Sequence, residues 1–176
     1  MEEYGKWATF QCEMKNQRQA SIKELDFPYE YRPGQKKLVS DVYRTIMRQK
    51  LLFMQAPTGV GKTISTIFPA VKAVGEELAD RIFYLTAKTI TATVAKETFA
   101  LLEKNGYRAK TIQITAKEKL CPCDEMECNP VTCPYAKGHF DRVNDAVFDL
   151  LHRCEMIERD DILSQADRYT VCPFEL

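Results

Sequence analysis

The chain has 176 residues, of which 45% are apolar and 28% charged, and its formal net charge at pH 7 is zero. This length allows one ordinary domain with a true core and a smaller appended module, and the composition is that of a soluble globular protein. No apolar run is long enough to span a bilayer, and the N-terminal residues lack the apolar core of a secretory signal, so we expect a cytoplasmic protein.

The charged residues are distributed unevenly along the chain. Residues 1–80 carry 12 basic and 10 acidic side chains, residues 81–119 carry 8 and 3, and residues 120–176 carry 5 and 12. A basic middle segment is typical of a protein that binds a polyanion. A solvated surface would have the same composition, so charge alone does not decide between the two.

The first part of the chain leads into a helix. Residues 1–26 are interpreted as a helical or partly ordered lead-in, and residues 27–35 as an extended aromatic segment with two prolines and a glycine. The side-chain amide of Gln35 has a donor and an acceptor and could read the edge of an adenine, although a plain loop is the simpler interpretation. A repeat of apolar residues every four positions predicts a helix over about 35–49.

A phosphate-binding loop follows a predicted strand. The continuous apolar run Leu51–Gln55 predicts a parallel strand buried on both faces, and residues 64–74 predict a helix. The loop between them consists of Ala56, Pro57, Thr58, Gly59, Val60, Gly61, Lys62 and Thr63. Its backbone N–H groups and the helix N-terminus suit a polyphosphate, Lys62 the terminal phosphates of ATP, and the Thr63 hydroxyl Mg²⁺.

One residue departs from the usual pattern of this loop. The motif ordinarily begins with Gly, and Ala56 stands at that position here. A small residue still permits the turn, and the context of strand, loop and helix favours a nucleotide site over a turn without a ligand.

Two further strands are predicted, over residues 81–86 and 110–115, and residues 86–93 lead into a helix that ends near residue 104. The unit of strand 51–55, helix 64–74 and strand 81–86 has a length that predicts a right-handed parallel crossover. The expected fold class is therefore α/β, a partial parallel sheet of the P-loop NTPase (RecA-like) type, with a mainly helical cysteine-rich insertion.

Hydroxyl residues gather at the start of the helix that ends near residue 104. Thr86, Lys88 and Thr89 belong to this group. Hydroxyls and N–H groups at a helix N-terminus can hold a nucleic-acid backbone without reading its sequence. Threonines also cap helices and bond locally, and the residues alone leave both readings open.

The C-terminal third of the chain contains a group of cysteines. An odd total of 7 cysteines without a signal peptide argues against a disulfide framework. The predicted ligands have irregular spacing, and they are Cys121, Cys128, Cys133 and Cys172. Four thiolates suit tetrahedral Zn²⁺ or a [4Fe–4S] cluster, and the absence of paired Cys-x2-Cys knuckles favours the cluster.

Other cysteines compete for this role or stand outside it. Cys123 is a rival ligand, Cys154 is interpreted as a small core residue, and Cys12 as a bystander. Between Cys133 and Cys172 we predict a helix with one apolar face and a shorter helix that begins near residue 160. The residues of that apolar face are Phe140, Val143, Val147, Leu150 and Leu151.

Four segments in order resemble the iron–sulfur helicases of the XPD/DinG type within superfamily 2. They are residues 31–35, 56–63 and 84–89 and the four-cysteine insertion, and the match runs from about residue 25 to residue 176. Two stretches, Cys-Pro-Tyr-Ala-Lys-Gly-His-Phe-Asp-Arg and Val-Cys-Pro-Phe-Glu-Leu, are similar to the bacterial DinG-related branch.

The resemblance implies an ATP-driven helicase that moves 5′ to 3′ on single-stranded DNA and separates forked duplexes. Gln35 would read adenine, Thr86, Lys88 and Thr89 would follow the DNA backbone, and the four cysteines would hold a [4Fe–4S] cluster. The implied division is a lead-in (1–26), the first part of motor domain 1 (27–116) and a cluster domain (117–176). Lys137 and Arg142 are expected on one DNA-facing side of the acidic cluster domain.

The chain lacks the acidic Asp-Glu-Ala-His-type box and the second motor domain of this family. We therefore expect a fragment that binds nucleotide but does not turn over ATP. Two alternatives remain: a nucleotide- or DNA-binding module with a structural zinc site that does not unwind DNA, and another P-loop NTPase or kinase with a zinc ribbon.

Overall fold

The structure is a computed structural model and describes residues 2–87 and 89–176. Helices make up 54% of the chain, and the described residues contain one two-stranded parallel sheet, so the arrangement is mostly helical and compatible with part of an α/β fold. The chain forms two compact units, Met1–Ala109 and Lys110–Leu176. This boundary lies at residues 109 and 110, whereas the sequence divided the chain at 116 and 117.

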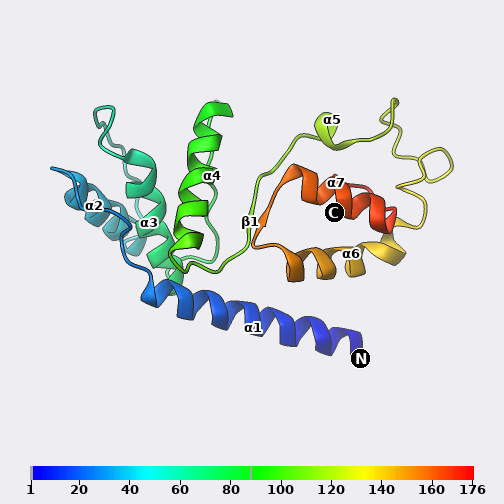
Figure 1. Cartoon of the computed structure of the whole chain (residues 1–176), viewed down its shortest axis with the longest axis horizontal. Coiled ribbons are helices and arrows are strands. Elements are labelled where there is room, and N and C mark those ends of the chain that lie inside the picture. Colours follow the sequence, from blue (N-terminus) through cyan, green and yellow to red (C-terminus); the bar gives the residue numbers. More distant parts are fainter. Residues whose placement is uncertain (1, 88) are drawn as a thin grey trace. The chain divides into compact units, whose positions relative to one another are not determined.

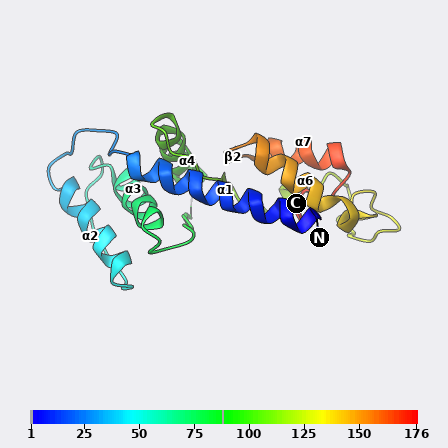
Figure 2. The same cartoon turned by 90° about the horizontal axis from the view of Figure 1, so that it is seen from below.

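The first unit contains four helices, and α3 lies among the other three (Figure 1). They are α1 (Glu2–Glu24), α2 (Gln35–Met47), α3 (Lys62–Gly75) and α4 (Thr89–Lys104). Helix α3 contacts the other three, and Figures 1 and 2 both show α2 running beside it. The predicted helices are confirmed, and the N-terminal lead-in is a continuous helix. The apolar core of this unit comprises Ile22, Leu25, Ile64, Ile67, Phe68, Val71, Val74, Ala95, Leu102 and Tyr107.

The end of α1 lies very close to the end of α3. A Cβ added at Gly75 would lie 2.3 Å from a methyl carbon of Ile22, so only glycine permits this approach. The Lys72 ammonium donates to the carbonyl oxygens of Ile22 at 2.7 Å and Lys23 at 3.3 Å. These carbonyls have no partner within α1 because they belong to its C-terminal end, and a cation is well placed there.

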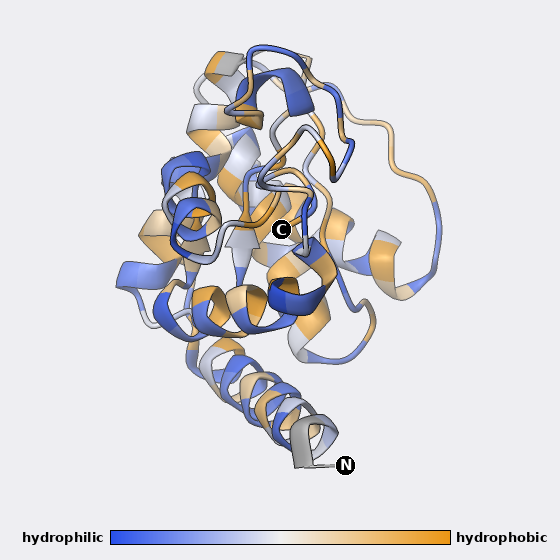
Figure 3. Cartoon of the chain, turned by 90° about the vertical axis from the view of Figure 1, so that its right-hand side faces the viewer, coloured by the Kyte–Doolittle hydropathy of each residue, from blue (hydrophilic) through white to orange (hydrophobic). Residues whose placement is uncertain are grey.

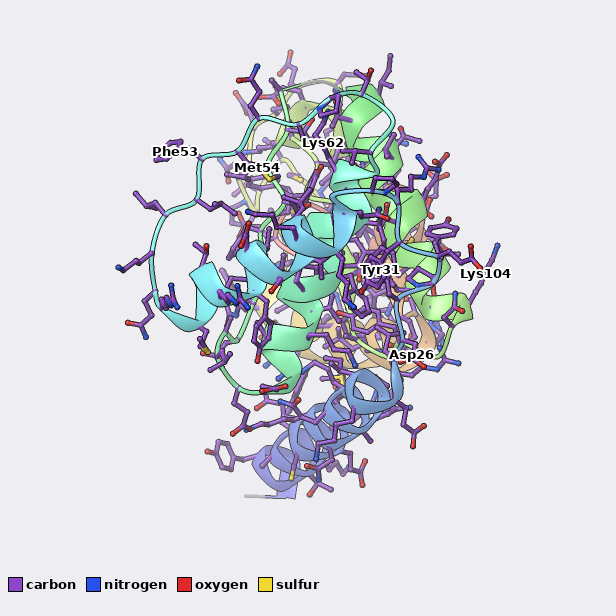
Figure 4. All side chains as sticks on the ribbon, turned by 90° about the vertical axis from the view of Figure 1, so that its left-hand side faces the viewer. Asp26, Tyr31, Phe53, Met54, Lys62 and Lys104 are labelled. Atoms are coloured by element: carbon purple, nitrogen blue, oxygen red, sulfur yellow. The ribbon has the colours of Figure 1, made fainter. Side chains whose placement is uncertain are left out.

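The predicted strands over residues 51–55 and 81–86 are wrong in this structure. Both segments are irregular, and the side chains of Leu51, Phe53 and Leu85 are 86%, 92% and 88% exposed. Figure 4 shows Phe53 pointing away from the helices. Figure 3 colours much of the loop that contains Phe53 as hydrophobic. A buried parallel strand needs hydrogen-bonding neighbours, and none pairs with these segments among residues 2–87 and 89–176.

One side of residues 81–86 is nevertheless held in place. Ile82 and Tyr84 pack against the core of the first unit, while Phe83 and Leu85 point the other way. This alternation has the period of two that an extended strand produces.

The second unit joins a short sheet to helices. Its elements are β1 (Thr111–Ile112), α5 (Lys117–Leu120), α6 (His139–Arg153), β2 (Met156–Ile157) and α7 (Arg159–Tyr169). Strands β1 and β2 are parallel, with Thr111 opposite Met156. The strand predicted over residues 110–115 is thus reduced to two residues, and its partner lies in the cysteine-containing unit. The shorter helix predicted near residue 160 is confirmed as α7.

Helices α6 and α7 lie side by side in both cartoon views (Figures 1 and 2). The predicted apolar face of α6 is partly wrong, because Phe140 is 86% exposed, whereas Ala146 and Leu150 are buried. A buried amide forms part of the interface: Gln165 Nε2 donates to the Ala146 carbonyl at 2.7 Å and to Asp149 Oδ2 at 3.0 Å.

No helix in the described part of the chain is both long and apolar enough to cross a bilayer.

Candidate nucleotide and metal sites

The two glycines of the loop before α3 have left-handed backbone conformations. Gly59 and Gly61 both have positive φ angles, 83° and 76°. Gly61 is the N-cap residue of α3, so the first N–H groups of the helix open directly onto this loop. Since only glycine adopts such φ angles without strain, the two glycines determine the shape of the loop.

The structure brings Gln35 into contact with this loop. Its side chain is 3% exposed, and its Oε1 accepts a hydrogen bond from the Arg32 backbone N–H at 3.0 Å. A Cβ added at Gly61 would lie 2.6 Å from Gln35 Nε2. The amide that was assigned to adenine therefore lies against the second glycine of the loop, 26 positions away in sequence.

Arg32 is a residue of this site that the sequence reasoning missed. Its guanidinium donates to the carbonyl oxygen of Gly59 and so ties the segment before α2 to the glycine loop. In the sequence, Arg32 lies between Tyr31 and Pro33, three positions before Gln35. A contact across 27 residues could not be read from that position alone.

Lys62 closes the loop onto itself. Its Nζ donates to the carbonyl oxygens of Ala56 and Pro57, each at 3.0 Å, and Figure 4 shows the side chain beside the loop. An anionic phosphate would be a stronger partner for this ammonium than two neutral carbonyls. Thr63 lies next to it, half-buried in the first turn of α3.

The predicted DNA-backbone residues are only partly described. Thr86 is exposed just before α4, and Thr89 is the first residue of that helix. Lys88 and the side chain of Thr89 lie outside the described residues. The contact between this segment and DNA stays a prediction.

One irregular segment of the second unit contains Cys121, Cys123, Cys128 and Cys133. Residues 121–138 form bends and turns without helix or strand. Cys123 Sγ lies 3.8 Å from Cys133 Sγ, and Cys123 also interacts with Cys121. Partial burial and, next, the hydrogen bond with Cys133 raise the pKa of Cys123 to about 11.

Lys117 connects the remaining thiols of this group. It lies within hydrogen-bonding reach of Cys128, and this contact raises the pKa of its ammonium, with smaller contributions from Cys172 and Cys121. Sequence reasoning missed Lys117, although its position four residues before Cys121 on a short helix was visible.

Cys121, Cys128 and Cys172 thus share Lys117 as an electrostatic neighbour, while Cys123 lies beside Cys133 and also interacts with Cys121. Cysteine thiolates are the type of ligand that binds zinc or an iron–sulfur cluster. Among residues 2–87 and 89–176, however, no three His, Cys, Asp or Glu side chains are at distances suited to one metal ion. The binding of a metal or cluster by these residues stays a prediction.

Buried His139 positions the most distant cysteine. Its side chain is 5% exposed, and its Nδ1 accepts a hydrogen bond from the Cys172 backbone N–H at 3.1 Å. His139 therefore holds the backbone of Cys172, 33 residues away, at the start of α6. The sequence signal was weak, because a lone histidine at a helix start has many ordinary roles.

Arg142 has a structural role that differs from the expected DNA-facing one. Its Nε donates to the Tyr169 carbonyl at 2.8 Å, and its Nη2 donates to the carbonyls of Thr170 at 2.6 Å and Lys137 at 2.7 Å. The guanidinium holds the turn before α6 against the end of α7. Its donors are consequently directed at backbone oxygens, and the expectation of a shared DNA-facing side gains no support from them.

The two cysteines outside the set differ from each other. Cys154 packs against the apolar cluster of Leu120, Leu150, Ile157 and Ile162, and burial raises the pKa of its thiol. Cys12 is exposed on α1.

Comparisons of the chain with protein-family models, with curated proteins and with solved structures found no match.

Proposed function

We propose that this chain carries the ATP-binding loop and the iron–sulfur module of an ATP-dependent DNA helicase with the P-loop NTPase fold, a cytoplasmic protein of the XPD/DinG type. The observation that carries the proposal is the contact between Gln35 and Gly61. An adenine-reading amide is useful only if it lies close to the phosphate loop, because one nucleotide must touch both.

Several residues of the loop, together with Gln35, have separate tasks in the proposed nucleotide binding. The N–H groups that follow Gly61 cradle the phosphates, and Lys62 exchanges the carbonyls of Ala56 and Pro57 for the terminal phosphates. Thr63 supplies an oxygen for Mg²⁺. Gln35 would exchange the Arg32 backbone N–H, from which its Oε1 accepts in this structure, for the adenine edge.

Binding of a fluorescent ATP analogue tests this part. We expect Lys62→Ala to weaken binding by about tenfold or more, because a charge-assisted hydrogen bond contributes roughly 1.5–3 kcal/mol. Gln35→Ala should reduce the preference for ATP over GTP. Lys37→Ala is the matched control, since Lys37 is an exposed lysine of α2 that pairs with Asp41. Equal affinities of Lys62→Ala and Lys37→Ala would refute the phosphate site.

Cys121, Cys128, Cys133 and Cys172 would hold the [4Fe–4S] cluster. When bound, such a cluster supplies a rigid tie among four thiolates and a redox-capable centre. The chain's own residues prepare the site: His139 positions Cys172, and Lys117 supplies a positive charge beside Cys128.

Metal analysis after anaerobic purification tests the cluster. We expect iron and sulfide, with each Cys→Ser change at the four ligand positions abolishing their retention and Cys12→Ser leaving it unchanged. One zinc per chain and no iron would support the alternative, a binding module with a structural zinc site. A loss of metal from Cys123→Ser but not from Cys121→Ser would exchange these two residues in the ligand set.

DNA binding is proposed for Thr86, Lys88 and Thr89. Contacts to phosphates release counterions, so the affinity for single-stranded DNA should fall as salt rises, and Lys88→Ala should reduce the salt slope by about one contact. Fluorescence anisotropy with a labelled oligonucleotide measures both quantities. A Lys88→Ala slope equal to that of the unaltered chain would remove this residue from the interface.

A further inference from the structure

We propose that Cys123 and Cys133 form a disulfide when the cysteine module holds no metal, and that this bond blocks metal loading until it is reduced. The blocking step rests on the proposed function, because it requires Cys133 to be a ligand. The bond itself does not, since it depends only on the two thiols.

The sulfur atoms are already neighbours. Cys123 Sγ and Cys133 Sγ are 3.8 Å apart, and a disulfide requires about 2.0 Å, so less than about 2 Å of movement closes the gap. Both side chains are half-buried, which leaves them within reach of a small molecule.

The chain between the two residues can accommodate this movement. Cys123 lies in a bend, and residues 121–138 contain no helix or strand whose hydrogen bonds would have to break. Cys133 is held more firmly, because its N–H donates to the Asn129 carbonyl at 2.8 Å and its own carbonyl accepts from Ala136 and Lys137 at 3.2 Å. We therefore expect Cys123 to move towards Cys133.

The other thiols of the group have a different neighbour. Lys117 lies within hydrogen-bonding reach of Cys128 and interacts more weakly with Cys172 and Cys121. Cys121 also interacts with Cys123 and is the main competitor, but a Cys-Pro-Cys segment would close only a strained small ring. Cys133 is thus the favoured partner.

A small-molecule disulfide such as oxidised glutathione supplies the oxidising equivalent. One protein thiolate attacks a glutathione sulfur and releases one glutathione thiolate, and the second protein thiolate then attacks the mixed disulfide and releases the other. The two cysteines lose two protons and two electrons, and one oxidised glutathione becomes two reduced molecules. Cys133 can no longer offer a thiolate, so the proposed ligand set lacks one member.

Disulfide mapping of the metal-free chain is the direct test. The chain is stripped with a chelator and a reductant, exposed to oxidised glutathione and blocked with N-ethylmaleimide. Trypsin alone leaves residues 120–137 together, because no Lys or Arg lies between Lys119 and Lys137, so cleavage after Glu125 and Glu127 is added. We expect peptides 120–125 and 128–137 to be crosslinked. Because they also contain Cys121 and Cys128, fragmentation should find N-ethylmaleimide on those two cysteines and the bond between Cys123 and Cys133.

Loading of metal tests the consequence. After oxidation the chain should take up little Fe²⁺ with sulfide, or little Zn²⁺, and dithiothreitol should restore uptake. Cys123→Ser should load metal before oxidation and keep most of that capacity afterwards, whereas Cys12→Ser should behave as the unaltered chain does.

Three outcomes overturn the proposal. They are alkylation of both Cys123 and Cys133 after oxidation, a dominant bond between other cysteines, and failure of Cys123→Ser to load metal, which would make Cys123 a ligand. A crosslinked chain that binds no metal even when reduced would instead overturn the proposed cluster and leave the disulfide standing.

Discussion

The glycine loop of the first unit and the cysteine segment of the second are organised in different ways. The loop is held by contacts within the chain: Arg32 bonds to Gly59, Lys62 bonds to Ala56 and Pro57, and Gln35 lies against Gly61. Residues 121–138 lack helix and strand, and their thiols converge without reaching metal-binding geometry. The glycine loop is therefore shaped by contacts within the chain, whereas the geometry of the thiols is left to the ligand that we propose for them.

The difference follows from the chemistry of the two ligands. A phosphate is bound mainly by backbone N–H groups, which a turn and a helix N-terminus can aim in advance. A metal is bound by side-chain thiolates that repel one another until the cation neutralises them. A preformed loop and an incomplete thiol group are therefore what each chemistry favours.

Metal removal should produce the largest effect and separates the two sites most clearly. We expect chelation of the metal-loaded chain to accelerate amide hydrogen exchange in residues 121–138 by at least about tenfold, because structural metal sites contribute roughly 10 kcal/mol. Exchange in residues 56–63 should not change. Hydrogen-exchange mass spectrometry measures both segments in one sample, and equal acceleration in the two would break the comparison.

A core substitution in the first unit tests whether the two units are stabilised independently. Leu102 of α4 is fully buried, and Leu102→Ala should lower the free energy of unfolding of the first unit by about 2–5 kcal/mol. Ile90→Ala is the control on the same helix, since Ile90 is 79% exposed and its change should cost less than about 0.5 kcal/mol.

Denaturant unfolding followed by hydrogen exchange assigns the loss to one unit. The metal content of Leu102→Ala should equal that of the unaltered chain. A parallel loss of metal would mean that the two units do not fold independently.

Alkaline pH should destabilise the first unit through Tyr107. Burial raises the pKa of this phenol to about 12, from an ordinary value of 10.0. The folded state therefore binds the proton more tightly, so its contribution is complete below pH 10 and is lost as the pH rises from 10 to 12. The rise of the pKa from 10.0 to about 12 corresponds to a loss of about 3 kcal/mol in the free energy of unfolding. Tyr107→Phe should remove this part of the pH dependence. Urea unfolding between pH 9 and 12 measures it, and identical slopes for both proteins would contradict the prediction.

The smallest stability effect is expected within the loop itself, where two glycines form a matched pair. Both have positive φ, so Ala at either position should cost about 1–2 kcal/mol of backbone strain. Only at Gly61 would the new Cβ also meet Gln35 Nε2, at 2.6 Å, whereas nothing lies within 4 Å at Gly59.

Gly61→Ala should therefore displace Gln35 and weaken ATP more than GTP, while Gly59→Ala should weaken both nucleotides equally. Competition binding against a fluorescent analogue gives the ratio. The same ratio for the two variants would separate Gln35 from nucleotide recognition.

Sequence reasoning was most successful where structure is local. Helices over about 35–49 and 64–74, and one that ends near residue 104, were predicted because their apolar periodicity and hydrogen bonds lie within a few positions. The end of α4 is also formed locally: Gly106 has a φ of 100°, and the Tyr107 N–H donates to the Leu102 carbonyl at 3.0 Å. The grouping of the four cysteines within residues 121–133 was visible because they lie close together in the sequence.

The failures involve partners that are distant in sequence. The apolar runs at residues 51–55 and 81–86 have strand character, but a strand exists only through its neighbours, and none pairs with them among the described residues. Phe140 fits the helical stripe of α6, yet the buried Gln165 of α7 turns a neighbouring face inward.

The sequence by itself determined the helices, the glycine loop and the kinds of donor available for a metal, because turns, caps and side-chain chemistry act over a few residues. Only the tertiary structure decided that Gln35 meets Gly61, that His139 holds Cys172 and that Cys123 lies beside Cys133. Each of these contacts joins positions separated by 10 to 33 residues, and packing rather than local preference brings such positions together.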